Sequence, residues 1–122
     1  YLESCHPDSL AIGIGNAHGF YKGPVDIKVD ILRQCREFTD IPFVLHGCTG
    51  MDEETVKKSI EYGVAKINFG TQIRYQYVDY IRQGLEEKVD QGHAWRLSRY
   101  ASDKLKDDVK KLILLAGSEN KA

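Results

Sequence analysis

The 122-residue sequence lacks the features that would place a chain in a membrane or on a nucleic acid. No apolar run approaches the ~20 residues that a membrane-spanning helix needs, and no basic region followed by a hydrophobic one opens the sequence. The net charge of −1 supplies no positive field for holding a phosphodiester backbone. We therefore expect neither a membrane nor a nucleic acid as a partner.

Cysteine is scarce, and the sequence is short for some of the folds that it could adopt. Cys5, Cys35 and Cys48 leave one thiol unpaired in any disulfide scheme, and none of them lies in a Cys-x-x-Cys spacing. Reduced thiols in a cytoplasmic protein fit this usage best. The sequence has no starting methionine and falls well short of the ~250 residues of a complete β/α barrel. We expect it to be part of a longer protein.

What the sequence does contain is a regular alternation of strand and helix signals. Hydrophobic residues make up 42% and charged residues 29%, as in a globular protein. Apolar runs of strand length, each followed by a polar turn with glycine, occupy residues 9–14, 41–45 and 64–69. Nearly continuous apolar strands separated by helices predict parallel strands buried on both faces. No flexible linker interrupts the pattern, so we predict one partial α/β domain over residues 1–122.

Helix signals fill the remaining sequence. A helix is predicted over residues 51–63, with Asp52 as its cap and Gly63 as its stop. Apolar residues at intervals of four predict a long amphipathic helix over about 72–89, and a last helix carries Leu105 and stops at Gly117. The intervening residues 90–103 are interpreted as a connecting segment.

Two histidines stand at equivalent points of the first two strand ends. His18 and His46 each precede a glycine directly. In parallel α/β folds the loops after neighbouring strands converge, so neutral imidazoles carried there can meet at one Zn²⁺ ion. Packing in the core is the alternative for either histidine alone. Two ligands are too few for zinc, which needs at least a third from elsewhere.

The same turns contain groups that suit a phosphate. Gly19, Gly47 and Gly50 leave main-chain N–H groups accessible, and Thr49 adds a hydroxyl. Lys22 brings a positive charge near His18, although solubility alone explains a single lysine.

The third strand ends in groups of the same kind. Asn68 ends an apolar strand, where a buried amide needs a partner. An amide there makes sense if it binds a ligand. Thr71 could cap the next helix and hold a phosphate at its N-terminus.

Two other functional hypotheses for these motifs have less support. Glycines at 13, 15 and 19 resemble a dinucleotide fingerprint, but Pro24 interrupts the helix that should begin there. Cys48 and His46 could form a thiol catalytic pair, but residues this close in a turn usually point apart. A thiol enzyme therefore stays the weaker hypothesis.

The motifs together resemble the C-terminal half of the class II, metal-dependent ketose-bisphosphate aldolases. The resemblance runs from about residue 8 to 122 and includes DSLAIGIGNAHGFYKG, PFVLHGCTG, KINFGTQIR and the tail LLAGSENKA. It implies a TIM (β/α)₈ barrel to which these residues contribute about the last three β/α units. It also implies reversible cleavage of fructose or tagatose 1,6-bisphosphate to dihydroxyacetone phosphate and glyceraldehyde 3-phosphate. Zn²⁺ would stabilise the enediolate.

The resemblance assigns roles to individual residues. His18 and His46 match two of three zinc ligands, and a monovalent cation, Na⁺ or K⁺, is often held near Gly19 and Thr49. Substrate binding is implied for Gly19, Lys22, Gly47, Cys48, Thr49, Asn68, Phe69, Gly70 and Thr71. The first zinc histidine and the catalytic aspartate of the family match no residue here, so we expect this chain alone to be inactive. Such enzymes are commonly homodimers or homotetramers.

Some residues depart from the family pattern. Cys48 stands where glycine or alanine is usual, Gln72 where an acidic residue is common, and Asn16 and Gly70 are less usual. These departures motivate an alternative function, a phosphosugar-binding relative that has lost catalysis.

Overall fold

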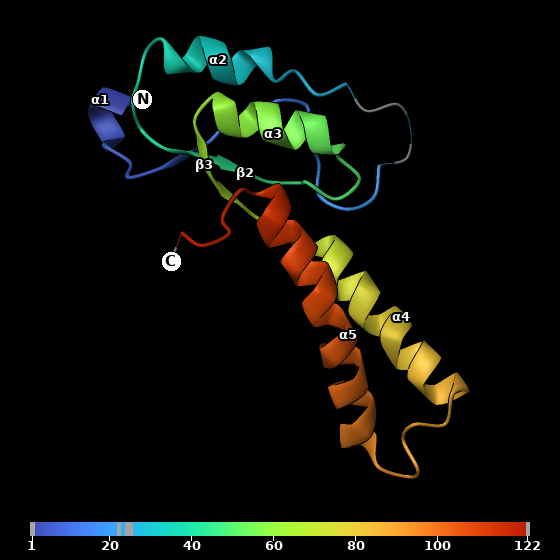
Figure 1. Ribbon diagram of the computed structural model, residues 1–122. Coiled ribbons are helices and arrows are strands. Elements are labelled where there is room, and N and C mark those ends of the chain that lie inside the picture. Colours follow the sequence, from blue (N-terminus) through green and yellow to red (C-terminus); the bar gives the residue numbers. More distant parts are fainter. Residues whose placement is uncertain (1, 22, 24–25, 122) are drawn as a thin grey trace. The chain divides into compact units, whose positions relative to one another are not determined.

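The computed structural model describes residues 2–21, 23 and 26–121. They divide into two compact units, Tyr1–Phe69 and Gly70–Ala122, which are described separately (Figure 1). The prediction of one partial domain stays a prediction.

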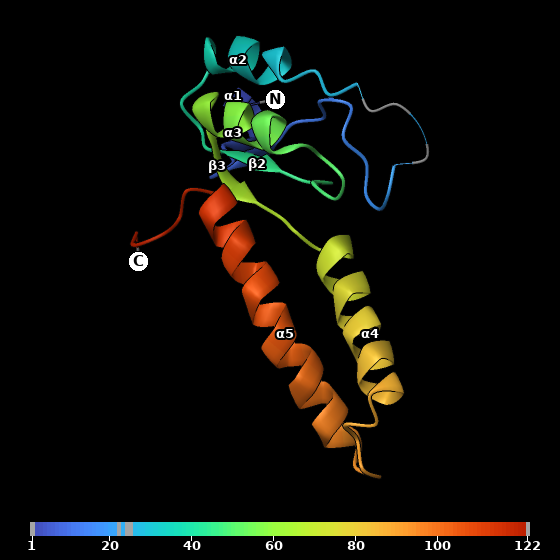
Figure 2. The same ribbon diagram turned by 45° about the vertical axis from the view of Figure 1, so that its right-hand side comes forward.

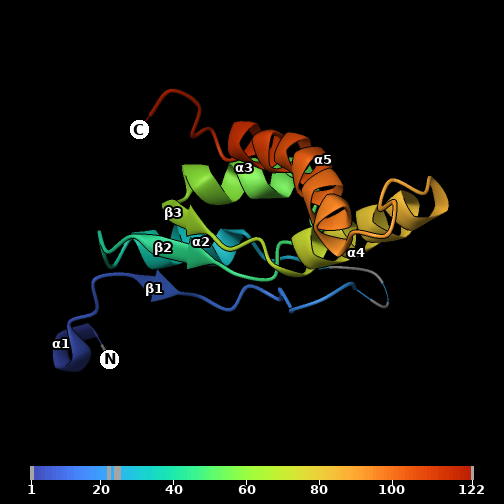
Figure 3. The same cartoon turned by 90° about the horizontal axis from the view of Figure 1, so that it is seen from below.

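The first unit is built around a parallel three-stranded sheet. Its strands are β1 (Leu10–Ala11), β2 (Phe43–Leu45) and β3 (Val64–Ile67), in the order β1-β2-β3. Figure 3 shows them side by side in this order. The pairing is in parallel, with Leu10 opposite Phe43 and Phe43 opposite Val64. The predicted parallel strands are confirmed, although each is shorter than its apolar run.

Helices cover one side of this sheet. The helix α2 (Asp30–Arg36) joins β1 to β2, and α3 (Glu53–Glu61) joins β2 to β3. Figures 1 and 2 show both helices on the same side of the strands. A short helix that the sequence did not predict, α1 (Leu2–Cys5), precedes β1. The predicted alternation of strands and helices is therefore confirmed.

The core of the first unit lies between the sheet and these helices. Its large fully buried apolar side chains come from β2, from α2 and α3 and from the loop after β1, and are Phe43, Leu45, Leu32, Val56 and Ile14. At the strands themselves, Ala11, Ala65 and Lys66 are exposed. Within the first unit, α2 and α3 lie on one side of the sheet, and burial of the strands on both faces stays a prediction.

The helix α3 has the end signals that the sequence predicted. The carboxylate of Asp52 accepts a hydrogen bond from the main-chain N of Thr55 at 2.8 Å and from its hydroxyl at 2.6 Å. Gly63 follows the last turn with a φ of +101°, a conformation that glycine adopts most easily. These hydrogen bonds lower the pKa of Asp52 below its usual value.

The second unit is a hairpin of two helices, α4 (Thr71–Glu86) and α5 (Ala94–Leu115). Gly84 of α4 is buried, and a Cβ built on it would lie 3.0 Å from Leu97 and 3.1 Å from Tyr100 of α5. A glycine there lets the two helices approach closely. The hydroxyl of Tyr80 donates to Asp108 Oδ2 at 2.6 Å, which joins the helices farther along. No helix in the described part of the chain is long and apolar enough to cross a bilayer.

The prediction that residues 90–103 connect two helices was wrong from Ala94 onward. Leu97 and Tyr100 pack against Gly84, and Ala101 is fully buried, so these residues are the first part of the α5 contact face. Polar residues between them obscure the helical spacing in the sequence. The last helix therefore begins at Ala94, 11 positions before Leu105.

We predict that Asp52→Ala lowers the urea midpoint of unfolding at neutral pH, because it removes the cap of α3. Asp52→Asn should retain most of the stability, since asparagine caps equally well. The folded pKa of Asp52 is lowered, so its ionic contribution is present above the unfolded pKa of ~3.9 and is lost as the pH falls through the folded value. The loss of stability that Asp52→Ala causes relative to the wild type should therefore become smaller below about pH 4. An equal loss of stability at pH 3 and at neutral pH would show that the charge of Asp52 does not contribute.

Candidate active site

The two predicted histidines meet at the carboxyl ends of adjacent strands. His46 follows β2 directly, and His18 lies in the loop after β1. Their ring centroids are 5.6 Å apart, and the ring planes cross at 70°. His46 is half-buried and His18 is exposed. The parallel pairing of β1 and β2 thus brings together side chains that are 28 positions apart in the sequence.

Asn16 connects the two histidine loops. Its side-chain Nδ2 donates to the main-chain carbonyl of His46 at 2.7 Å, and its Oδ1 accepts from the main-chain N of Ile14 at 3.0 Å. The amide therefore ties the loop after β1 both to itself and to its neighbour. The sequence drew attention to Asn16 only as a departure from a family pattern.

Tyr21 makes a second connection between the same loops. Its hydroxyl donates to the main-chain carbonyl of Gly47 at 2.8 Å and accepts from the main-chain N of Ala17 at 3.3 Å. Tyr21 was not among the predicted site residues. The signal that could have found it is the run of main-chain carbonyls in the HGCTG turn, which need donors from a neighbouring loop when they are buried.

The main chains of the loops also touch directly. Gly47 has a φ of +64°, and a Cβ built on it would lie 2.4 Å from the carbonyl oxygen of Ala17. Only glycine fits this approach, because both the conformation and the space exclude a side chain. Gly47 therefore has a structural requirement that is separate from its predicted contact with phosphate.

Asn68 brings the end of the third strand to the same place. Its main-chain N donates to the carbonyl of Leu45 at 2.9 Å, and its Nδ2 lies 3.3 Å from each ring nitrogen of His46. An amide nitrogen equidistant from both ring nitrogens is aligned with neither lone pair. The amide is thus close to His46 and retains hydrogen-bonding capacity for a further group.

The side chain of Cys48 packs in the core of the first unit and is not presented beside the two histidines. The side chain is 4% exposed and belongs to the apolar cluster that includes Ile14, with Sγ 3.7 Å from the carbonyl of His46. Burial raises the pKa of the Cys48 thiol to about 11. A nucleophilic cysteine needs its thiolate, so this environment weighs against the thiol-enzyme hypothesis. Any contact of Cys48 with a substrate would come from its main chain.

The other predicted binding residues have different environments. Gly19 has a φ of +96° with open space around its Cα, and Thr49 is buried in the HGCTG turn. Phe69 packs against the core of the first unit. Lys22 lies outside the described residues.

Gly70 and Thr71 belong to the second unit. Gly70 is the N-cap of α4, and Thr71 is its first residue, whose hydroxyl accepts from Arg74 at 3.3 Å. The expectation that Thr71 caps this helix was therefore wrong by one position, because the chain turns into the helix at Gly70.

The two histidines fit a tetrahedral zinc ion as part of its ligand set. Two imidazoles bound at ~2.0–2.1 Å place their ring centres roughly 5.2 Å apart, close to the spacing in this structure. Among the described residues there is no group of three or more histidine, cysteine, aspartate or glutamate side chains that could complete the set.

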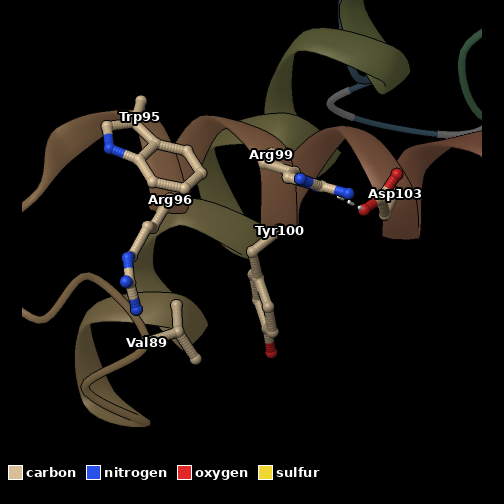
Figure 4. Close-up of a pocket in the computed structure, with 6 residues that line it drawn as sticks. All are labelled: Val89, Trp95, Arg96, Arg99, Tyr100 and Asp103. Atoms are coloured by element: carbon tan, nitrogen blue, oxygen red, sulfur yellow. Dashed lines mark ion pairs between the residues drawn. The ribbon is translucent and has the colours of Figure 1, made fainter.

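A hollow lies in the helical hairpin. Its volume is about 330 Å³, and Figure 4 shows the residues around it, with Arg96 lying beside Trp95. The lining side chains are Val89, Trp95, Arg96, Arg99, Tyr100 and Asp103. The guanidinium of Arg96 lies 5.4 Å from the Trp95 ring centre, and Arg99 pairs with Asp103 at 3.9 Å. None of these residues was predicted to belong to a site.

Comparison with known proteins gives one family. A model of the class-II fructose-bisphosphate aldolases matches residues 1–121. The YdjI aldolase from Escherichia coli K12 is 26% identical with a TM-score of 0.83, and covers 99% of this chain and 43% of its own. A putative fructose-1,6-biphosphate aldolase from Coccidioides immitis is 28% identical with a TM-score of 0.85, covering 98% and 41%.

A third similar structure agrees in fold. The fructose-bisphosphate aldolase from Campylobacter jejuni has a TM-score of 0.80 at 23% identity, over 93% of this chain and 41% of its own. The chain thus spans about two fifths of the length of these three proteins.

We predict that Gly47→Ala separates the two histidine loops and destabilises the first unit by roughly 1–3 kcal/mol, because a strained φ and a main-chain contact cannot both be relieved. Gly13→Ala is the matched control, since a Cβ there would meet nothing within 4 Å. Urea unfolding of both variants measures the difference. Equal midpoints for the two would show that the Gly47–Ala17 approach is not a constraint.

We also predict that Cys48 resists alkylation in the folded protein. With its pKa at about 11, it should react with iodoacetamide at pH 8 at least about 100-fold more slowly than the exposed Cys5. Mass spectrometry of the modified peptides gives both rates, and in urea the two should become similar. Rapid native labelling of Cys48 would revive the thiol-enzyme hypothesis.

Proposed function

Because this chain belongs to the class-II fructose-bisphosphate aldolase family, we propose that it supplies part of a zinc-dependent aldolase active site. The reaction is the reversible cleavage of a ketose 1,6-bisphosphate, of fructose or tagatose, to dihydroxyacetone phosphate and glyceraldehyde 3-phosphate. The observation that carries the proposal is the meeting of His18 and His46, at 5.6 Å between ring centres, where two parallel strands end.

The histidines would hold the metal. His18 and His46 are two of the three zinc ligands, and the ion, when bound, supplies a Lewis acid for the ketone oxygen of the substrate. His46 emerges directly from β2, so its ring is carried by a rigid element. His18 depends on the loop after β1 for its place.

Other residues would bind and orient the substrate. The side-chain amide of Asn68 lies beside His46. It can donate hydrogen bonds to, and accept one from, the oxygen groups at the carbonyl end of the substrate. The main-chain N–H groups of the glycine turns suit a phosphate, and Lys22 would add its charge. The proposed set is Gly19, Lys22, Gly47, Cys48, Thr49, Asn68, Phe69, Gly70 and Thr71. A monovalent cation, Na⁺ or K⁺, would lie near Gly19 and Thr49.

The remaining catalytic residues would come from outside this chain. The catalytic aspartate that removes a proton and the third zinc histidine have no candidate here, and the chain spans about two fifths of the similar aldolases. We propose that these residues are about the last three β/α units of a barrel and are inactive alone. The complete enzyme would be a cytoplasmic homodimer or homotetramer. The exposed strand residues Ala11, Ala65 and Lys66 fit such a fragment, because in a complete barrel the side chains on the inner face of the sheet pack against those of other strands.

The alternative is a phosphosugar-binding relative without catalysis. Three residues that depart from the family pattern suggest this alternative, namely Cys48, Gln72 and Gly70. The burial of the Cys48 side chain removes the first of them, because a thiol that points into the core leaves the surface of the loop unchanged. We therefore keep the enzyme as the main proposal.

We predict that a chelator abolishes ketose-bisphosphate cleavage by the complete enzyme and that added Zn²⁺ restores it. His18→Ala and His46→Ala should each lower turnover by more than about 100-fold, because each removes a metal ligand. His6→Asn is the control, since His6 is exposed and asparagine tolerates its φ of +43°. Zinc and phosphosugar binding without turnover would favour the alternative, and chelator-resistant cleavage would contradict the proposal.

A further inference from the structure

We infer that Asn16 and Tyr21 are positioning residues that set the place of His18 relative to His46. The inference rests on the proposed function, in which these histidines share a metal. The two side chains are called the loop clamp below. They flank His18 in sequence, two positions before it and three positions after it.

The position of His18 needs an external support. The loop between β1 and α2 has no regular secondary structure in its described residues, and Gly15 and Gly19 on either side of His18 adopt φ values of +91° and +96°. Within the described chain no side chain hydrogen-bonds to the His18 ring, which lies in a T-shaped arrangement with the ring of His46. The ring therefore has the position that its main chain gives it.

The loop clamp supplies that support at two consecutive carbonyls. Asn16 donates to the carbonyl of His46 at 2.7 Å, and Tyr21 donates to the carbonyl of Gly47 at 2.8 Å. Both acceptors belong to the turn that carries the other histidine. The loop of His18 is thus tied on both sides to the main chain of the His46 turn.

Each member of the clamp also constrains its own loop. Asn16 Oδ1 accepts from Ile14, whose side chain is fully buried in the core, and Tyr21 accepts from the main-chain N of Ala17, next to His18. The Tyr21 ring lies 3.4 Å from the position that a Cβ on Gly50 would occupy. The bonds therefore connect the core, the loop of His18 and the turn of His46 into one network. Groups that orient metal ligands commonly change metal affinity by about 10–100-fold when they are removed.

The test compares Asn16→Ala and Tyr21→Phe with two controls in the complete protein. Tyr21→Phe removes both hydroxyl bonds and keeps the ring. Tyr62→Phe, just before β3 at the opposite end of the sheet, and Asn120→Asp, in the exposed C-terminal segment, are the matched controls. Metal affinity is measured with Zn²⁺, and ligand geometry is read from the visible absorption of bound Co²⁺. Hydrogen exchange of the metal-free protein reports the order of residues 15–21.

We expect each clamp variant to lose about 10–100-fold in metal affinity, to change the Co²⁺ spectrum and to exchange faster over residues 15–21, with the global unfolding midpoint nearly retained. The controls should match the wild type. Clamp variants with wild-type affinity, spectrum and exchange would overturn the inference, as would a loss of global stability with unchanged metal binding. If the wild type binds no metal, the proposed function fails. Faster exchange confined to residues 15–21 of the clamp variants then supports the clamp, and unchanged exchange overturns it.

Discussion

The parallel pairing of β1 with β2 is the constraint on which the candidate site depends. Leu10 lies opposite Phe43 and Ala11 opposite Val44, so both strands end at the same edge of the sheet. The loops that follow must then run side by side, and Gly47 allows their main chains to touch at Ala17. Hydrophobic burial on the helix side, from Phe43 and Leu45, holds this register, because a shift by one residue would turn these side chains out of the core. The histidine pair is a consequence of sheet register.

Features that depend on local chemistry could be predicted from the sequence. Asp52 and Gly63 mark the ends of α3 because a cap and a left-handed stop need particular residue types. His18 and His46 stand out because both follow apolar strands and precede glycine. Contacts between distant positions could not be predicted in the same way. Asn16 and Tyr21 reach carbonyls 30 and 26 positions away, and only the folded loops show which donor meets which acceptor. The start of α5 was missed because its contact face depends on the space above Gly84, on another helix.

The structure separates two kinds of requirement within the HGCTG turn. Gly47 is needed for the approach of the loops, and Cys48 fills the core below them, while His46 is presented at the strand end. A turn built in this way presents one chemical group and uses its neighbours to hold it.

The central claim is that His18 and His46 bind one zinc ion. Anomalous diffraction at the zinc edge, from crystals of the complete protein, tests it most directly. We predict one strong peak within ~2.0–2.1 Å of a ring nitrogen of each histidine, with a third ligand from a residue outside this sequence. A zinc peak that is bound by neither histidine, or by only one of them, would contradict the account.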